Sequence, residues 1–155
     1  KVICVHQETL DPPDLESDIE RQPVSYGRGQ LMPLHRGAPS KAILANMNFR
    51  LVRPIYHADP EAMAAVGFGE NWTEVKRSLR ALRNADAIVT KGDLPGGMQG
   101  MALPVFDQQS VIGSLSVIMA QSREMPPRET LAPRLAEAVR EIEANMNAAE
   151  LQPQS

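Results

Sequence analysis

The chain has 155 residues, of which 43% are hydrophobic and 23% charged, as expected for one globular domain that buries its core without disulfides or metal ions. Its net charge of -3 argues against a nucleic-acid-binding surface, which needs an excess of Lys and Arg. No apolar run approaches the ~20 residues that cross a bilayer, so we expect no membrane partner.

The chain starts at Lys1, directly in an apolar stretch and without a signal-peptide leader, so we expect a fragment of a longer protein. Cys4 is the only cysteine, which excludes a disulfide framework and favours a reducing, cytoplasmic compartment. We interpret it as a buried thiol.

The N-terminal part is predicted to be extended. β-branched residues favour a strand over 1–8, and the prolines and acidic residues of 9–20 favour a loop. A second extended stretch is expected over 22–34, bent around Gly27 and Gly29.

The next segments are mainly helical. HRGAPSKAILANM at 35–47 predicts a helix that is entered through a turn of small residues, and a short second helix is expected over 61–66. Between them, 49–60 contains Pro54 and Pro60. Its apolar residues fit either a short strand or irregular packing, so it stays unassigned.

The segment 73–83 predicts an amphipathic helix, because Val75, Leu79 and Leu82 form one stripe. Trp72 is expected to anchor its start by packing. A second stripe is basic and consists of Lys76, Arg80 and Arg83. This stripe is either a solvated helix face, which we favour, or a grip for an anionic partner.

Strands dominate the region that follows. We expect a strand over 87–89, a glycine-rich turn at 92–100, a strand over 101–106, a turn at 107–110 and a strand over 111–119. The last two strands are predicted to form a hairpin.

Apolar residues then recur at spacings of three or four over 128–149, which predicts a long closing helix with one face on the sheet. The tail at 151–155 is expected to be disordered. This order of elements indicates an α/β (α+β) sandwich with a mainly antiparallel sheet.

The motifs of common cofactor and catalytic sites are absent. The sequence contains no GxGxxG, GxxxxGK[ST] or GxSxG, and no HExxH or CxxC spacing. His6, His35 and His57 are isolated from one another, and we interpret each as structural. We therefore expect no catalytic residue, no metal and no cofactor.

The features that remain suit a binding pocket. They are a turn of small residues, a glycine-rich turn, and a hairpin with Ser114 and Ser116 between large apolar residues. Small residues allow a ligand to approach closely, and hydroxyl groups orient it in an apolar cavity. The alternative is that the same residues only pack the sheet.

Three segments in fixed order resemble the effector-binding domain of the IclR family of transcription regulators: LMPLHRGAPSKAILA at 31–45, WTEVKRSLRALRNADAIV at 72–89, and GGMQGMALPVFDQQSVIGSLSVI at 96–118. The family pattern has Pro-Leu-His before a small-residue turn, and later Pro-Val-Phe-Asp before Leu-Ser-Val. The run at 122–146 is similar to the family's last helix, so the resemblance covers nearly the whole chain.

The resemblance implies a GAF-like fold, in which a curved, mainly antiparallel sheet with helices packed against it cups a small organic effector. Residues 1–150 would form this domain and 151–155 a tail, while a winged helix-turn-helix domain that binds DNA would precede Lys1. The implied function is a bacterial, cytoplasmic ligand sensor without enzyme activity. Its implied partners are the effector and other copies of the chain, in a dimer or tetramer.

The resemblance also implies a pocket lined by the turn before Lys41, the strand end before the glycine-rich turn, and the inner faces of the last two strands. In this sequence, the resemblance places six residues in the pocket, and strand parity adds Tyr26. The predicted pocket residues are Tyr26, Ala38, Pro39, Thr90, Gly100, Ser116 and Ile118. Tyr26 rests on parity alone, and a core tyrosine is the alternative.

Three positions depart from the family's polar pattern. The family often has an acidic residue in place of Thr90, a glycine in place of Ser40 and a second serine in place of Ile118. Because a polar ligand would lose partners here, we expect an apolar or aromatic effector.

Two other functions are weighed against the sensor. The first is a small hydrolase or isomerase with Asp93 or Asp107 as base. The second is a structural oligomerisation module without a ligand, in which Gly100 and Ser116 only pack.

Overall fold

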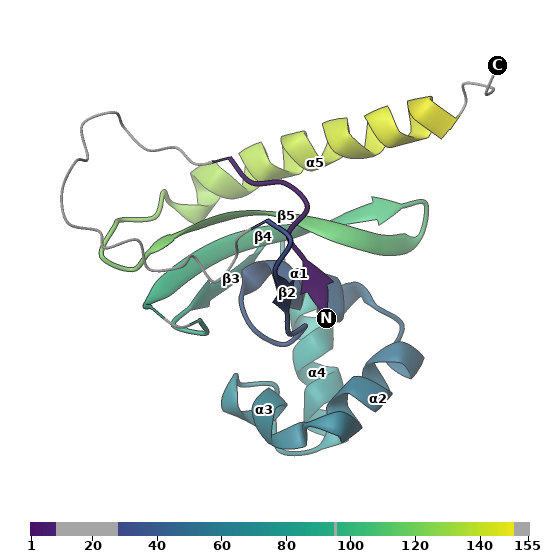
Figure 1. The fold of residues 1–155 in the computed structure, drawn as a ribbon, viewed down its shortest axis with the longest axis vertical. Helices are drawn as coiled ribbons and strands as arrows, with labels where there is room; N and C mark the ends of the chain where they lie inside the picture. Colours follow the sequence, from purple (N-terminus) through teal and green to yellow (C-terminus); the bar gives the residue numbers. More distant parts are fainter. Residues whose placement is uncertain (9–27, 95, 151–155) are drawn as a thin grey trace.

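A computed structural model gives the fold of the chain (Figure 1) and describes residues 1–8, 28–94 and 96–150. Its centre is a three-stranded antiparallel sheet, with one long helix on one face and a group of helices on the other. The α+β class is therefore confirmed. The predicted loop at 9–20, Tyr26 and the predicted tail at 151–155 lie outside the described residues. In the described ranges, no helix is long and apolar enough to cross a membrane.

The sheet consists of β3 (Ile88–Lys91), β4 (Met98–Asp107) and β5 (Ser110–Ala120), in that order. β4 and β5 form the predicted hairpin, which Asp107 and Ser110 close as the last pair of the ladder. Successive residues of a strand point to opposite faces, so each strand contributes side chains to both sides of the sheet.

The long helix α5 (Arg128–Glu150) covers one face of the sheet, and the predicted closing helix is confirmed (Figure 1). Leu135 and Val139 lie one turn apart and point to the sheet, as their spacing predicted. The buried cluster on this face consists of Ala87, Met101, Leu103, Val105, Ala132, Leu135 and Val139. Glu143 adds a polar link, because its Oε1 accepts a hydrogen bond of 2.8 Å from the backbone N of Phe106.

The other face of the sheet is covered by α1 (Ala38–Asn46), and α4 (Trp72–Arg83) packs on α1. Both helices were predicted. Gly37 is the N-cap of α1 and has a φ of 78°, a conformation that favours glycine, which explains the small-residue entry to this helix. The core between these helices and the sheet includes Leu44, Val75, Leu79 and Ala102.

The segment 49–60, which the sequence left between strand and irregular structure, forms a helix. α2 (Phe49–Ala58) is followed at once by α3 (Pro60–Ala65), so both alternatives were wrong. Pro54 is tolerated inside α2 because it lies on the exposed side, where water can satisfy the carbonyl that loses its partner. Asn48 stabilises the start of α2 by accepting a hydrogen bond of 2.9 Å from the backbone N of Arg50.

The basic stripe of α4 packs on aromatic rings. The guanidinium carbons of Arg80 and Arg83 lie 5.4 and 5.0 Å from the centre of the Phe49 ring, and Lys76 Nζ lies 6.0 Å from that of Trp72. Arg83 also donates hydrogen bonds to two carbonyls at the end of α1. The stripe therefore joins α4 to α1 and α2, a structural role that requires no anionic partner.

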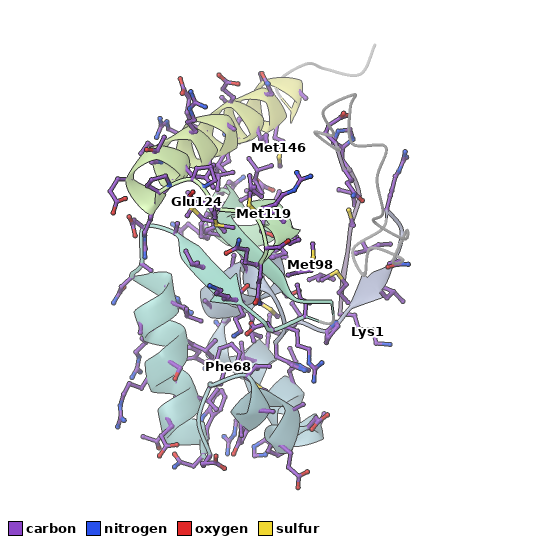
Figure 2. All side chains as sticks on the ribbon, turned by 90° about the vertical axis from the view of Figure 1, so that its left-hand side faces the viewer. Lys1, Phe68, Met98, Met119, Glu124 and Met146 are labelled. Carbon is purple, nitrogen blue, oxygen red and sulfur yellow. The ribbon has the colours of Figure 1, made fainter. Side chains whose placement is uncertain are left out.

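The N-terminal segment forms only a short ladder. β1 (Val2–Ile3) pairs with β2 (Leu31–Met32), so the strand expected over 1–8 is much shorter than predicted. One further hydrogen bond of 2.8 Å, from the backbone N of Gly29 to the carbonyl of Cys4, holds the segment. Figure 2 shows this segment, with Lys1 at its start, standing beside the sheet rather than within it.

Candidate ligand-binding site

A cavity of about 1090 Å³ lies between β5, α1 and the N-terminal segment 1–8. Its volume is slightly above the range of about 300–1,000 Å³ that is typical of small-molecule sites. Met98, at the start of β4, lies between the sheet and the N-terminal segment in Figure 2 and lines the cavity.

The inner wall of the cavity is β5. Ser114, Ser116 and Ile118 are alternate residues of this strand, so they share the face that is turned towards α1. All three are only half-buried, although the opposite face of the same strand packs towards α5. With Ser110 at the start of the strand, β5 thus offers three hydroxyl groups to a wall that also carries apolar side chains.

The second wall is one face of α1 and its continuation. Pro39, Ile43, Asn46 and Met47 lie at helical spacing and line the cavity together. Asn46 Nδ2 donates a hydrogen bond of 2.9 Å to the carbonyl of Ala42, which fixes the orientation of this amide. This wall is apolar with an amide at its far end.

The outer wall and the rim carry exposed apolar side chains. Ile3 and Val5 of the N-terminal segment are 53% and 74% exposed, and Leu51 and Ile112 across the opening are 60% and 51% exposed. Apolar residues gathered around an opening, rather than scattered singly, are typical of a binding site.

The residues predicted from the resemblance fall into two groups. Pro39, Ser116 and Ile118 line the cavity. Thr90 and Gly100 are paired across β3 and β4, and Gly100 pairs in turn with Ile118, so the three form one row across the sheet. Only the Ile118 end of this row reaches the cavity.

The other end of the row is closed by α1. Thr90 is 7% exposed and Ala38 1% exposed. A Cβ placed on Gly100 would lie 3.5 Å from the Cβ of Ala38, in ordinary van der Waals contact, so the strand and the helix leave room for a methyl group there but not for a larger side chain. Ala38, Thr90 and Gly100 therefore pack beside the cavity without lining it.

The sequence interpretation missed Ile43, Asn46 and Met47, and the whole N-terminal wall. Helical spacing from Pro39, which was predicted, could have found the three residues of α1. No local signal could have placed residues 1–8 opposite β5, because that contact depends on the chain path between them.

A buried ion pair fixes the entry to α1. Lys41 is 8% exposed, and its Nζ lies 2.7 Å from Asp93 Oδ2 and donates a hydrogen bond of 3.0 Å to the carbonyl of Val66. Asp93 Oδ2 also accepts a hydrogen bond of 3.3 Å from the backbone N of Gly37. Asp93, considered above as a catalytic base, is thus engaged in holding α1, and Asp107 does not line the cavity.

The histidines have separate environments, as their spacing indicated. Burial lowers the pKa of His35 below its ordinary value of 6.5, and the charge of Arg36 acts in the same direction. Asp59 opposes them, and Lys41 lowers the pKa by the smallest effect of the four. His57 Nε2 accepts a hydrogen bond of 3.3 Å from Arg53 Nε. Among the described residues, no group of three His, Cys, Asp or Glu side chains is arranged to hold a metal ion.

Comparison with known proteins was informative only at the level of structure: no protein-family model and no curated protein matches the chain. The C-terminal domain of a protein described as a transcriptional regulator from Vibrio cholerae has a TM-score of 0.68 at 22% identity, over 89% of this chain and 76% of that one. The inducer-binding domain of PobR from Acinetobacter, a double mutant in complex with 3-hydroxybenzoic acid, has a TM-score of 0.63 at 17% identity, over 81% and 74%.

An IclR transcriptional regulator from Alicyclobacillus acidocaldarius has a TM-score of 0.60 at 26% identity, over 76% of this chain and 47% of that one. The present chain thus spans about half the length of this regulator. The fold is that of a regulatory domain of transcription factors. Specifically, it is the fold of the C-terminal domains of IclR-type regulators, which confirms the resemblance inferred from the sequence.

Proposed function

We propose that this chain is the effector-sensing domain of a bacterial IclR-type transcription regulator, and that a small organic effector binds in the cavity between β5, α1 and residues 1–8. The observation that carries the proposal is the large cavity on the inner face of β5, in a fold that also serves as the inducer-binding domain of PobR. We assign the domain no catalytic role, because Asp93 is paired with Lys41 and Asp107 lies outside the cavity lining.

The cavity suits a sensor because its walls come from separate parts of the chain. A ligand would contact β5, the face of α1 that carries Ile43, and the weakly held segment 1–8 at the same time. Binding would favour the arrangement in which all three walls meet the ligand, and a coupling of about 1–3 kcal/mol is enough to shift a regulator between states.

In the complete regulator, we propose that a separate winged helix-turn-helix domain on the N-terminal side contacts DNA and that the regulator works in the cytoplasm as a dimer or tetramer. Residues 1–150 would then be the sensor and 151–155 a tail. The share of the Alicyclobacillus regulator that this chain matches, 47%, leaves room for such a domain. The net charge of -3 is consistent with a domain that does not bind DNA itself.

The test is a thermal-shift screen of a broad metabolite library on the 155-residue chain and on Ser116→Leu, in which a larger side chain fills the cavity from β5. We expect at least one compound to raise the Tm of the wild type, because a ligand that binds only the folded state stabilises it. That shift should be lost in Ser116→Leu and kept in Thr130→Leu, a matched change at an exposed position of α5. A library without any stabilising compound would contradict the proposal and favour a purely structural module.

A further inference from the structure

We infer that the effector of this domain is an uncharged, largely apolar molecule with hydrogen-bonding groups, and not a carboxylate or another anion. The inference rests on the proposed function, because it concerns the chemistry of the same cavity. Three observations support it: the described residues that line the cavity include no buried cation, the positive end of α1 already has a carboxylate partner, and neutral polar groups stand on two walls.

The cavity offers no buried positive charge to a ligand. Among the described residues that line it there is no arginine, and its basic residues are Lys1 and His6, both exposed on the outer wall. His6 Nε2 already lies 3.0 Å from Glu8 Oε1. A carboxylate placed against β5 would lose its hydration without gaining a charged partner, which is strongly unfavourable.

The N-terminal end of α1 and the ammonium group of Lys41 already interact with a carboxylate of the chain itself. The N-terminal end of a helix attracts anions, because its backbone N–H groups and its dipole point outwards there. In this protein the carboxylate of Asp93 occupies that position, since it accepts a hydrogen bond from the backbone N of Gly37 and pairs with Lys41. The chain thus supplies its own anion at the place where an anionic ligand would otherwise be stabilised.

Neutral hydrogen-bonding groups stand on two walls. Ser114 and Ser116 present hydroxyl groups from β5, which can donate or accept. On the other side, Asn46 uses its amide nitrogen on a backbone carbonyl and Asn48 uses its amide oxygen to accept from a backbone N–H. Among the described residues, the Oδ1 of Asn46 and the Nδ2 of Asn48 have no hydrogen-bond partner, so they can accept from and donate to a ligand.

This pattern matches amides, lactams and phenols on an apolar body. Such groups supply both a donor and an acceptor without a net charge, so the serine hydroxyls and asparagine amides can pair with them. The apolar part would lie against Pro39, Ile43 and Ile118, and a cavity of about 1090 Å³ has room for more than one ring.

Isosteric pairs of compounds test the inference, because an amide and a carboxylate have nearly the same shape. We propose calorimetric titration of the 155-residue chain at pH 7.5 with 3-hydroxybenzamide against 3-hydroxybenzoate, and with 2-naphthamide against 2-naphthoate. We expect each amide to bind at least about tenfold more tightly than its carboxylate, since a buried polar group without a partner costs that much or more.

A variant with an added cation should reverse this preference. Ser116→Lys places an ammonium group at the wall of the cavity, so 2-naphthoate should gain at least about tenfold over the wild type. The matched control is Thr130→Lys on α5, which changes the net charge equally but lies across the sheet from the cavity and should leave both affinities unchanged.

Carboxylates that bind the wild type as tightly as their amides, or more tightly, would overturn the inference and leave the proposed function intact. If neither member of a pair binds, the inference is tested instead by the charge of the compounds that the thermal-shift screen identifies. A neutral compound whose effect is lost in Ser116→Leu supports the inference, and an anionic one overturns it. A screen without any binder would overturn the proposed function and this inference together.

Discussion

The surface of the sheet that faces α1 has two halves that differ sharply. The closed half, formed by Ile88 and Thr90 of β3 with Gly100 and Ala102 of β4, is covered by α1 and is almost inaccessible to solvent. The open half is formed by Ser114, Ser116 and Ile118 of β5, which are half-buried and line the cavity.

The difference lies in what covers each half. On the closed half, Ala38 lies so near Gly100 that an added Cβ on this glycine would already be in van der Waals contact with it, and the Lys41–Asp93 pair holds the start of the helix in place. On the open half, the cover is the N-terminal segment, and the backbone hydrogen bonds that hold it among the described residues are those of the short β1–β2 ladder and one from Gly29. The row of paired residues from Thr90 through Gly100 to Ile118 therefore has one end that is packed under α1 and one end that a ligand can reach.

The largest expected effect on stability comes from breaking the ion pair that holds α1 over the closed half. Asp93→Ala leaves the ammonium of Lys41 buried without its charged partner, which should lower the free energy of unfolding by about 3–5 kcal/mol. Urea denaturation of the wild type and the variant measures this change in the free energy of unfolding. The control is Asp86→Ala, which breaks the exposed pair with Arg128 and should cost less than about 1 kcal/mol. Equal losses in the two variants would show that the Lys41–Asp93 pair is not what holds α1.

A matched pair of glycine substitutions sharpens the comparison. Gly100→Leu forces a side chain between β4 and Ala38 and should destabilise the fold by about 1–3 kcal/mol. Gly113→Leu, on the face of β5 opposite to that of Ser114 and Ser116, points into open space and should change stability by less than about 0.5 kcal/mol. Chemical denaturation of both variants measures their free energies of unfolding, and a larger loss at Gly113 would contradict the close packing of α1 on β4 at Gly100.

A smaller effect is expected at Ser40, which is fully buried in α1 and whose Oγ has no hydrogen-bond partner among the described residues. Ser40→Ala removes this unsatisfied hydroxyl and improves helix propensity. It should therefore raise the free energy of unfolding by about 0.5 kcal/mol. A loss of more than that in urea denaturation would mean that the hydroxyl has a partner which this account does not include.

The smallest effect is a pH dependence from His35, which precedes α1. Because its folded-state pKa lies below 6.5, the unfolded chain takes up the proton first as the pH falls. The contribution of neutral His35 to the free energy of unfolding is complete above pH 6.5 and is lost as the pH falls through the folded-state pKa. Thermal unfolding between pH 7.5 and 5 should thus show a shallower decline in His35→Gln than in the wild type. Parallel declines would rule out His35 as the source.

Much of this fold follows from local pattern. The hairpin, α4 and α5 have apolar residues at a clear period, so their faces were predictable from spacing alone, but β4 begins at Met98, within the segment predicted as a glycine-rich turn. α2 was not, because Pro54 argues against a helix in any local interpretation, and only its burial of Val52 and Tyr56 against the other helices outweighs that cost.

The site was predictable only in part. Strand parity and the resemblance named both ends of the row from Thr90 to Ile118, but parity cannot tell which end a helix will cover. That depends on the fit of Ala38 to Gly100, a long-range contact that appears only once the chain is folded. The sequence therefore identified the correct face of the sheet without showing which half of it is open.

The most direct test of the account is the affinity of the best compound from the screen for two matched variants, Ser116→Val in the open half and Thr90→Val in the closed half. Thr90→Val replaces a hydroxyl by a methyl group, and Ser116→Val does the same with one further methyl group; the two positions are in the same sheet and on the same face. The account predicts that Kd rises at least about tenfold in Ser116→Val and changes less than about twofold in Thr90→Val. The reverse result, with affinity lost at Thr90 and kept at Ser116, would place the ligand in the half described here as closed and contradict the account.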